Sequence, residues 1–76
     1  MADATWAPIR TAADLGAFLR QLRQQRGWTQ AELADELGVT RQYVVELEGG
    51  KPNLYSDRLF QALRLLGGSL RAEERT

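Results

Sequence analysis

The sequence predicts an all-α fold, a compact bundle of four to five short helices, on the basis of three observations. First, apolar residues recur at intervals of three and four in several stretches, the spacing that gathers them on one side of a helix. Second, a threonine or serine precedes each stretch, where its side-chain oxygen can accept a hydrogen bond from a free backbone N–H. Third, glycines follow the stretches and can end the helices. The 76 residues are enough for one domain only.

The centre of the fold is expected at residues 29–50, which predict two short helices joined by a tight turn. Thr29 and Thr40 are placed as the N-caps of these two helices. Glu32, three residues after Thr29, completes a capping box. Gly38 can take the left-handed backbone conformation that ends the first of the two helices. Helix, glycine turn and helix in this order are the arrangement of a DNA-binding helix-turn-helix.

The two helices of this motif are expected at about 30–37 and 41–48, and two further helices flank them. The preceding helix begins at Thr11, with Asp14 in place for a second capping box. The following helix is expected from about 56 to 66. Each flanking helix carries an apolar stripe that should face the core. The stripes consist of Leu15, Phe18, Leu19 and Leu22 in the preceding helix and Leu59, Phe60, Leu63 and Leu66 in the following one.

The chain is expected to divide into an N-terminal arm at 1–10, a helix-turn-helix domain at 11–68, and a C-terminal tail or dimer strand at 69–76. The arm lacks helical periodicity. Its Trp6 and Ile9 could lie on a partner, but local packing on the first helix is the simpler expectation.

The composition excludes several classes of protein. Without cysteine or histidine the chain has no disulfides, no usual zinc site and no thiolate or imidazole for catalysis, so we expect neither a metal nor a cofactor nor an enzyme. No apolar run of about 18 residues and no signal peptide is present, which indicates a cytoplasmic protein without membrane contact. Ten basic and ten acidic residues balance, which disfavours strong non-specific binding of DNA by a monomer.

The helix at 41–48 has an inward apolar side and an outward polar side, and the outward side suits contacts with DNA bases. Gln42 could pair with adenine, Arg41 with guanine or a phosphate, and Val45 with the methyl group of thymine. Glu46 could accept a hydrogen bond from the amino group of cytosine, although its charge is unfavourable beside phosphates. The alternative is an ordinary solvent-exposed helix face.

Four other residues are expected to contact DNA phosphates: Gln30, Thr40, Tyr43 and Lys51. The first three lie in the first turns of the two central helices or just before them, where backbone N–H groups favour anions. Lys51 lies just beyond the second of these helices and could reach a phosphate with its long side chain.

Glu48 falls on the inward side of the helix at 41–48, where an unpaired carboxylate would be costly. Arg23 is the best candidate for an ion-pair partner. The alternative is that Glu48 simply reaches solvent near the end of its helix.

Three segments resemble the Cro/repressor (Xre-type) helix-turn-helix family: Thr29-Gln30-Ala31-Glu32-Leu33-Ala34, Gly38-Val39-Thr40, and Val45-Glu46-Leu47-Glu48-Gly49-Gly50-Lys51-Pro52. The resemblance covers roughly residues 11–68 and implies a lambda-repressor-like fold. It also implies a set of residue roles: Gln30 on a phosphate, Arg41, Gln42, Val45 and Glu46 at base-reading positions, and an ion pair between Arg23 and Glu48.

Within that family, the chain most resembles Hip-type antitoxins. The supporting segments are Asp14-Leu15-Gly16, residues 20–28 and residues 66–70. This resemblance implies a kinase-type toxin as a protein partner. It also implies a homodimer in which a short strand, here at 69–72, pairs across the two subunits.

The sequence therefore predicts a homodimeric DNA-binding repressor, an antitoxin that represses its own operon by reading a palindromic operator in double-stranded DNA. The competing hypothesis is a protein-interaction module that holds a toxin or another partner and binds DNA little. The neutral overall charge favours this alternative to some extent.

Overall fold

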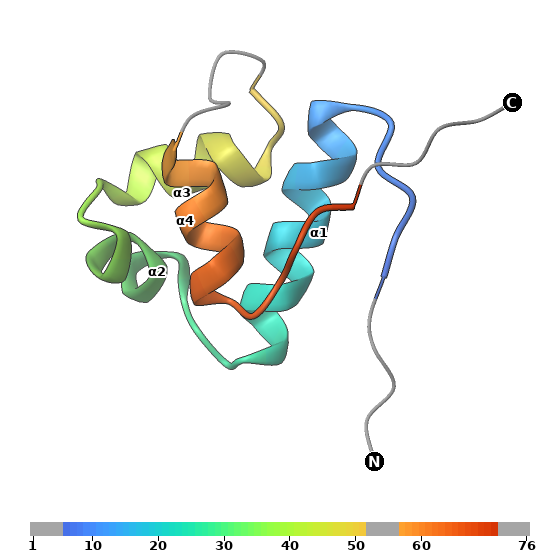
Figure 1. Cartoon of the computed structure of the whole chain (residues 1–76). Helices are drawn as coiled ribbons and strands as arrows, with labels where there is room; N and C mark the ends of the chain where they lie inside the picture. The colour runs from blue at the N-terminus through green and yellow to red at the C-terminus, as the bar shows by residue number, and fades with distance from the viewer. Residues whose placement is uncertain (1–5, 52–56, 72–76) are drawn as a thin grey trace, which may run out of the picture.

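The computed structural model describes residues 6–51 and 57–71, which form an all-α bundle (Figure 1). The helices are α1 (Ala12–Gln25), α2 (Gln30–Leu37), α3 (Arg41–Glu48) and α4 (Asp57–Leu65). The all-α prediction is confirmed, and α2 and α3 have the expected limits. Residues 69–71, the described part of the expected C-terminal strand, are irregular. The serine expected to cap α4 lies outside the described residues.

Threonine side chains begin the first three helices. The Thr29 hydroxyl accepts from the Glu32 N–H at 3.0 Å, and the Glu32 carboxylate accepts from the Thr29 N–H at 2.8 Å, so this capping box is complete. Thr11 likewise accepts from Asp14 N–H. The carboxylate of Asp14, however, accepts from the N–H of Arg10 at 2.9 Å instead of from Thr11, so the second capping box is shifted back by one residue.

The turn between α2 and α3 depends on Gly38, whose φ of 71° lies in the left-handed region. This conformation lets the N–H of Val39 donate to the carbonyl of Ala34 at 3.0 Å, a bond that closes the end of α2. Val39 is half-buried and packs against the core. The chain then needs only Thr40 before α3 begins, and the two helices are held at a fixed angle.

The core is a single cluster of leucines with a few smaller residues, to which all four helices contribute. Leu33, Leu37 and Val44 are its almost inaccessible centre, at the junction of α2 and α3. One expectation for α4 is wrong. Phe60 is 45% exposed, and Ala62 is fully buried in its place. Phe60 lies about 100° around the helix from Leu59 and so points away from the buried side of α4. Ala62 lies on that buried side together with Leu59.

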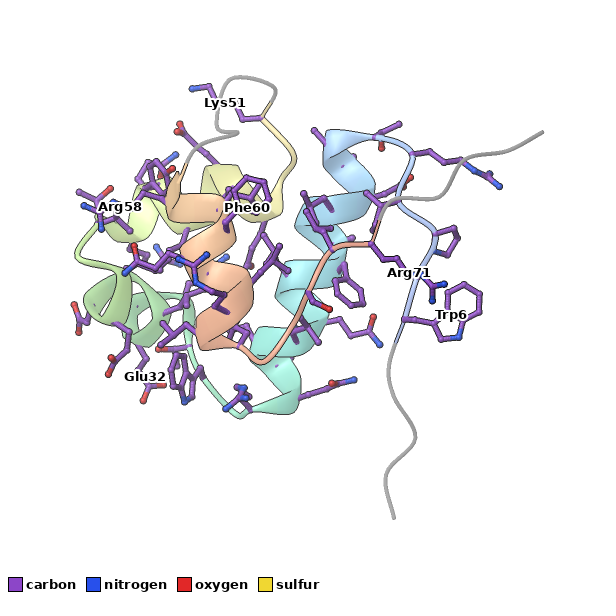
Figure 2. All side chains as sticks on the ribbon, viewed as in Figure 1. Trp6, Glu32, Lys51, Arg58, Phe60 and Arg71 are labelled. Carbon is purple, nitrogen blue, oxygen red and sulfur yellow. The ribbon has the colours of Figure 1, made fainter. Side chains whose placement is uncertain are left out.

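The expected packing of Trp6 and Ile9 on the first helix is also wrong. Trp6 is 79% exposed and points away from the helices (Figure 2), and Ile9 is exposed as well. Ala7, between them, packs against the core instead. Pro8 restricts the backbone between Ala7 and Ile9.

The helix α1 touches the end of α3 through backbone atoms. Gly16 is buried in α1, and a Cβ at this position would lie 2.6 Å from the carbonyl oxygen of Leu47 and closer still to that of Glu48. Only glycine permits so close an approach. The contact fixes how closely the C-terminal end of α3 packs against α1.

Candidate nucleic-acid interface

The two sides of α3 differ in burial as the helical spacing predicts. Val44, Leu47 and Glu48 are buried, whereas Arg41 and Gln42 are exposed. Three further residues of the outward half, namely Tyr43, Val45 and Glu46, are half-buried. The structure therefore brings the four proposed base-reading residues to one accessible surface, which we call the reading face: Arg41, Gln42, Val45 and Glu46.

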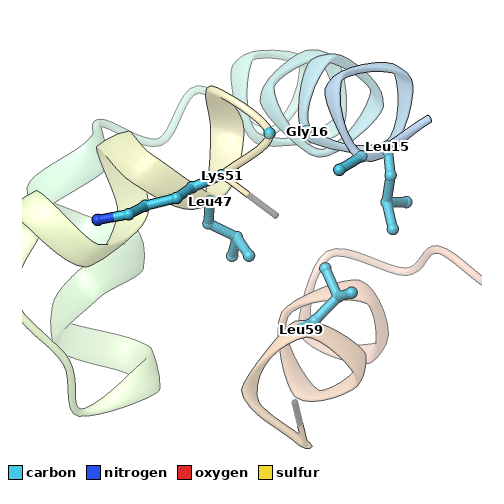
Figure 3. A pocket seen from close by; sticks show the side chains of 7 residues that line it. Leu15, Gly16, Leu47, Lys51 and Leu59 are labelled. Carbon is cyan, nitrogen blue, oxygen red and sulfur yellow. The ribbon is translucent and has the colours of Figure 1, made fainter. Parts of the chain in front are cut away.

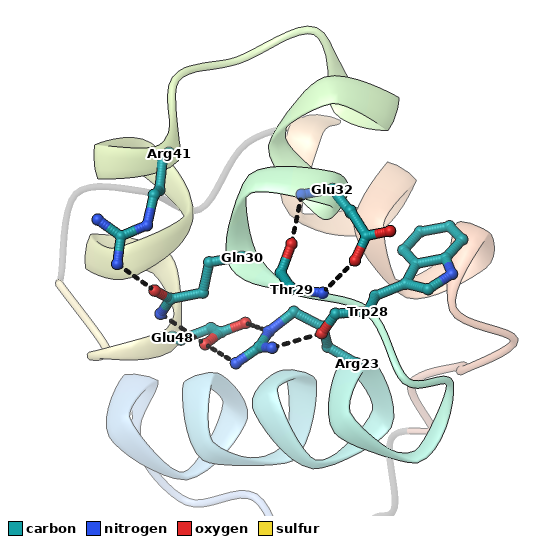
Figure 4. Close-up of polar contacts among 7 residues, drawn as sticks. All are labelled: Arg23, Trp28, Thr29, Gln30, Glu32, Arg41 and Glu48. Carbon is teal, nitrogen blue, oxygen red and sulfur yellow. Dashed lines mark hydrogen bonds and ion pairs between the residues drawn. The ribbon is translucent and has the colours of Figure 1, made fainter.

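Behind this face, Arg23 of α1 and Glu48 of α3 form a buried ion pair (Figure 4). The guanidinium donates from Nε to Glu48 Oε2 at 2.5 Å and from Nη2 to Oε1 at 3.1 Å. Its third nitrogen, Nη1, donates to the carbonyl of Trp28 at 2.7 Å. These bonds engage all three nitrogens of the guanidinium and both oxygens of the carboxylate, which offsets the cost of burying the two charges. The sequence predicts this partner for Glu48, and the structure shows the two side chains in contact.

Gln30 connects this ion pair to the reading face. Its Nε2 donates to Glu48 Oε1 at 3.2 Å, and its Oε1 accepts from Arg41 Nη2 at 3.2 Å. Figure 4 shows the resulting chain of side chains, which runs from Arg23 through Glu48 and Gln30 to Arg41. Gln30 therefore orients Arg41 in addition to lying near the N-terminus of α2. Sequence reasoning missed this link, because it depends on how α2 and α3 cross.

Glu46 is paired within the protein. Its Oε2 accepts from Lys51 Nζ at 3.3 Å and from Gln42 Nε2 at 3.4 Å. Two contacts lower the pKa of the Glu46 carboxyl below its ordinary value: the hydrogen bond from Gln42, which has the larger effect, and the hydrogen bond from Lys51. The carboxylate is thus charged at neutral pH. Sequence reasoning treated Glu46 and Lys51 as separate contacts, whereas the structure joins them.

Thr40 and Tyr43 lie at the first turn of α3, where DNA phosphates are expected. The hydroxyl of Thr40 accepts from the N–H of Tyr43 at 3.1 Å, so it serves as a helix cap. The ring of Tyr43 packs partly on the core. The first turn of an α-helix leaves backbone N–H groups without partners inside the helix, and these suit an anion.

An open groove of about 380 Å³ runs between α1 and the first turns of α2 and α3. It is lined by Arg20, Arg23, Thr29, Gln30, Ala31 and Arg41. Arg23 is paired with Glu48, and Arg26, the residue just after α1, donates to the carbonyl of Leu66 at 3.0 Å. Arg20 is therefore the arginine of α1 that the fold brings beside the reading face. Arginines clustered in one groove are a typical footprint of phosphate binding.

A second cavity is too small for an organic ligand. An apolar pocket of about 10 Å³ lies between α1, the end of α3 and α4, with Gly16, Leu47 and Leu59 in its wall (Figure 3). It holds one water at most, whereas ligand pockets measure roughly 300–1,000 Å³. Within residues 6–51 and 57–71, no three acidic, histidine or cysteine side chains gather as metal ligands would. No helix there is long and apolar enough to cross a bilayer.

The fold thus combines a capped helix, a left-handed glycine turn and a second helix whose polar side is accessible beside a groove lined by arginines. This arrangement defines a DNA-binding helix-turn-helix protein. Residues 19–72 match the helix-turn-helix family model, and the chain belongs to this family, of the Xre or Cro/repressor type. The protein is accordingly a helix-turn-helix DNA-binding transcriptional regulator.

Among its relatives is the uncharacterized HTH-type transcriptional regulator y4mF of Sinorhizobium fredii, which is 40% identical over 62 residues, or 82% of each chain. Several solved structures are also similar to this chain. A chain of the HipA-HipB-O2-O3 complex superposes with a TM-score of 0.79 at 27% identity, over 93% of this chain and all of the other. A chain of a complex of a HipB variant with an O2 20mer gives a TM-score of 0.81 at 28% identity, over 95% and 100%.

Proposed function

We propose that the protein is a homodimeric repressor that recognises a palindromic operator, and that it is the antitoxin of a toxin–antitoxin pair that represses its own operon. The observation that carries the repressor proposal is the reading face. Its first residue, Arg41, is already oriented by a hydrogen bond to Gln30 in the protein without DNA, so the side chain needs little ordering to contact a base. The similarity to HipB chains in complexes with HipA and with O2 supports the antitoxin role and a kinase-type toxin partner.

Each residue of the reading face has a chemical role in this proposal. Arg41 donates to guanine O6 and N7, and Gln42 pairs with N6 and N7 of adenine. Val45 contacts a thymine methyl group, and Glu46 accepts from the amino group of cytosine. Sequence specificity rests on these four side chains, since phosphate contacts position the protein without reading the sequence.

The phosphate contacts in this proposal surround the reading face. Gln30, Thr40, Tyr43 and Lys51 hold the DNA backbone near the first turns of α2 and α3 and beyond the end of α3, and Arg20 joins them from the groove. Dimerisation would place two copies of α3 about 34 Å apart, one turn of the double helix, so that each copy reads half of a palindrome.

A protein-interaction module with little DNA binding is the competing function. The observation in its favour is the balance of ten basic and ten acidic residues, together with exposed carboxylates on α2 at Asp35 and Glu36. In that case the exposed helix faces would hold a toxin or another protein.

Selection from a pool of randomised DNA duplexes tests the function directly. The wild-type protein should enrich a palindromic consensus, and Gln42→Ala should change which base is preferred at one position of each half-site. Arg20→Ala should instead weaken binding of all duplexes about equally and reduce the salt slope by roughly one unit. Failure to enrich any consensus, with dissociation constants above about 10⁻⁴ M at physiological salt, would favour the interaction module.

The mass of the protein in solution tests the dimer, and co-purification with the product of the adjacent gene tests the antitoxin role. We expect a species of twice the 8.5 kDa chain mass at micromolar concentration. A monomer that still enriches a palindrome would mean that the two copies assemble only on DNA.

A further inference from the structure

We propose that Glu46 is an internal competitor for DNA phosphate, which holds Lys51 on the protein until the correct base supplies a hydrogen-bond donor to the carboxylate. This inference rests on the proposed DNA-binding function and adds a way in which one residue couples affinity to sequence.

The first support is the geometry. One oxygen of Glu46, Oε2, lies 3.3 Å from Lys51 Nζ and 3.4 Å from Gln42 Nε2. A carboxylate oxygen so placed takes one of the three hydrogens of the Lys51 ammonium group and offsets the positive charge that would attract a phosphate. The Glu46 side chain is 31% exposed and that of Lys51 54%. The ion pair is therefore accessible to DNA, and such a solvated pair is weak enough to exchange.

The second support is the chemistry of base edges. Guanine O6 and N7 and thymine O4 are acceptors, and a carboxylate facing any of them is repelled. Cytosine N4 and adenine N6 carry donors, which can replace the ammonium group of Lys51 against Glu46. Every base pair carries one such donor, so the sequence determines whether a donor or an acceptor lies opposite Glu46. On a site that places an acceptor there, release of Lys51 leaves the carboxylate facing acceptors and phosphates. Exchange is therefore favourable only on a site with the correct base.

The third support is the role of Gln42. Its Nε2 carries two hydrogens, and donating one of them to Glu46 leaves the second and Oε1 free. A glutamine needs one donor and one acceptor for the bidentate contact with adenine. Glu46 can therefore orient Gln42 while it competes with phosphate for Lys51, and the three side chains act as one unit.

This arrangement changes what is expected of Lys51. A free lysine would strengthen binding to every duplex alike, because phosphates are the same in all sequences. A lysine held by Glu46 contributes fully only on the operator. Lys51→Ala should thus weaken operator binding clearly and leave the affinity for a shuffled duplex almost unchanged.

The test compares Glu46→Gln with Glu36→Gln, which removes the same charge from an exposed position on α2. Binding is measured on the duplex selected by the wild-type protein and on a shuffled duplex of equal composition, at several salt concentrations. Glu46→Gln should bind the shuffled duplex about five- to tenfold more tightly at about 0.1 M salt, with a slope steeper by about one unit. Glu36→Gln should shift both affinities equally.

Lys51→Ala completes the cycle in both backgrounds. In the wild-type background, Lys51→Ala should lower the affinity for the selected duplex, which stands for the operator. In the Glu46→Gln background it should lower the affinity for both duplexes. Equal effects of Glu46→Gln on the two duplexes, together with equal losses for Lys51→Ala, would overturn the inference and leave the repressor function standing. A wild-type protein that prefers no duplex would overturn the proposed function and this inference together. An unchanged urea midpoint for Glu46→Gln shows that the variant is folded.

Discussion

Arg23 and Glu48 join α1 to α3 through a buried, doubly hydrogen-bonded ion pair, with only 7% and 8% of the two residues exposed. Removing one member leaves the other charge in the interior without a partner. We expect Glu48→Ala to lower the free energy of unfolding by about 3–5 kcal/mol, measured by urea denaturation. The double variant Arg23→Met with Glu48→Leu should lose much less, because neither charge remains. Equal losses for the single and double variants would mean that packing, and not charge, determines the effect.

Gly16 gives a prediction opposite to ordinary helix propensity. In an exposed helix interior, alanine is more favourable than glycine by roughly 1 kcal/mol. At Gly16 the added methyl group would collide with backbone carbonyls at the end of α3, so Gly16→Ala should destabilise the protein by about 1–3 kcal/mol. The control is Ala17→Gly on the exposed face of α1, which should cost only the propensity difference. A more stable Gly16→Ala variant would show that the two helices can separate.

The capping box of α2 predicts a dependence of stability on pH. The hydrogen bond from the backbone N–H of Thr29 lowers the pKa of the Glu32 carboxyl. Because folding lowers this pKa, the stabilisation is complete above the value in the unfolded chain and is lost as pH falls through the folded value. Glu32→Gln keeps a hydrogen-bond acceptor but removes the charge. The urea midpoint of the wild type should therefore exceed that of the variant at about pH 7, and the two should converge near about pH 3. A difference independent of pH would exclude a contribution of the charge.

Phe60 and Leu63 lie on the same helix and should respond differently to truncation. Leu63 is almost fully buried, so Leu63→Ala should cost about 2–5 kcal/mol of unfolding free energy. Phe60→Ala removes an exposed ring and should change stability by less than about 0.5 kcal/mol. A large loss for Phe60→Ala that depends on protein concentration would place the ring in a contact between subunits.

Much of the fold is predictable from the sequence because its signals are local. Thr29, Glu32 and Gly38 act on backbone groups a few residues away, and they determine where α2 begins and ends. The inward positions of α3 follow from helical spacing alone. The error at Phe60 arises because a stripe drawn through every large apolar residue overlooks a small one, and Ala62 is the residue that the packing of α4 requires.

The connections within the site are less predictable, because they depend on distances between elements. The residues of the reading face can be proposed from one helix. The hydrogen bonds of Gln30 with Glu48 and Arg41 depend on the angle at which α2 and α3 cross. The spacing of residues in the sequence does not determine that angle. The selection of Arg20 likewise depends on the partners that Arg23, in α1, and Arg26, just after it, have elsewhere in the fold.

The close approach of Gly16 to the carbonyls of α3 has an evolutionary consequence. The reading helix, α3, is anchored through its backbone and its inner face, and Gln42, Val45 and Glu46 are not among its buried residues. Gene duplicates could therefore exchange these side chains and acquire new targets while they inherit an unchanged scaffold. The DNA sequence that is recognised can thus change without loss of stability. Such a scaffold suits sets of related regulators that bind different sites in one cell.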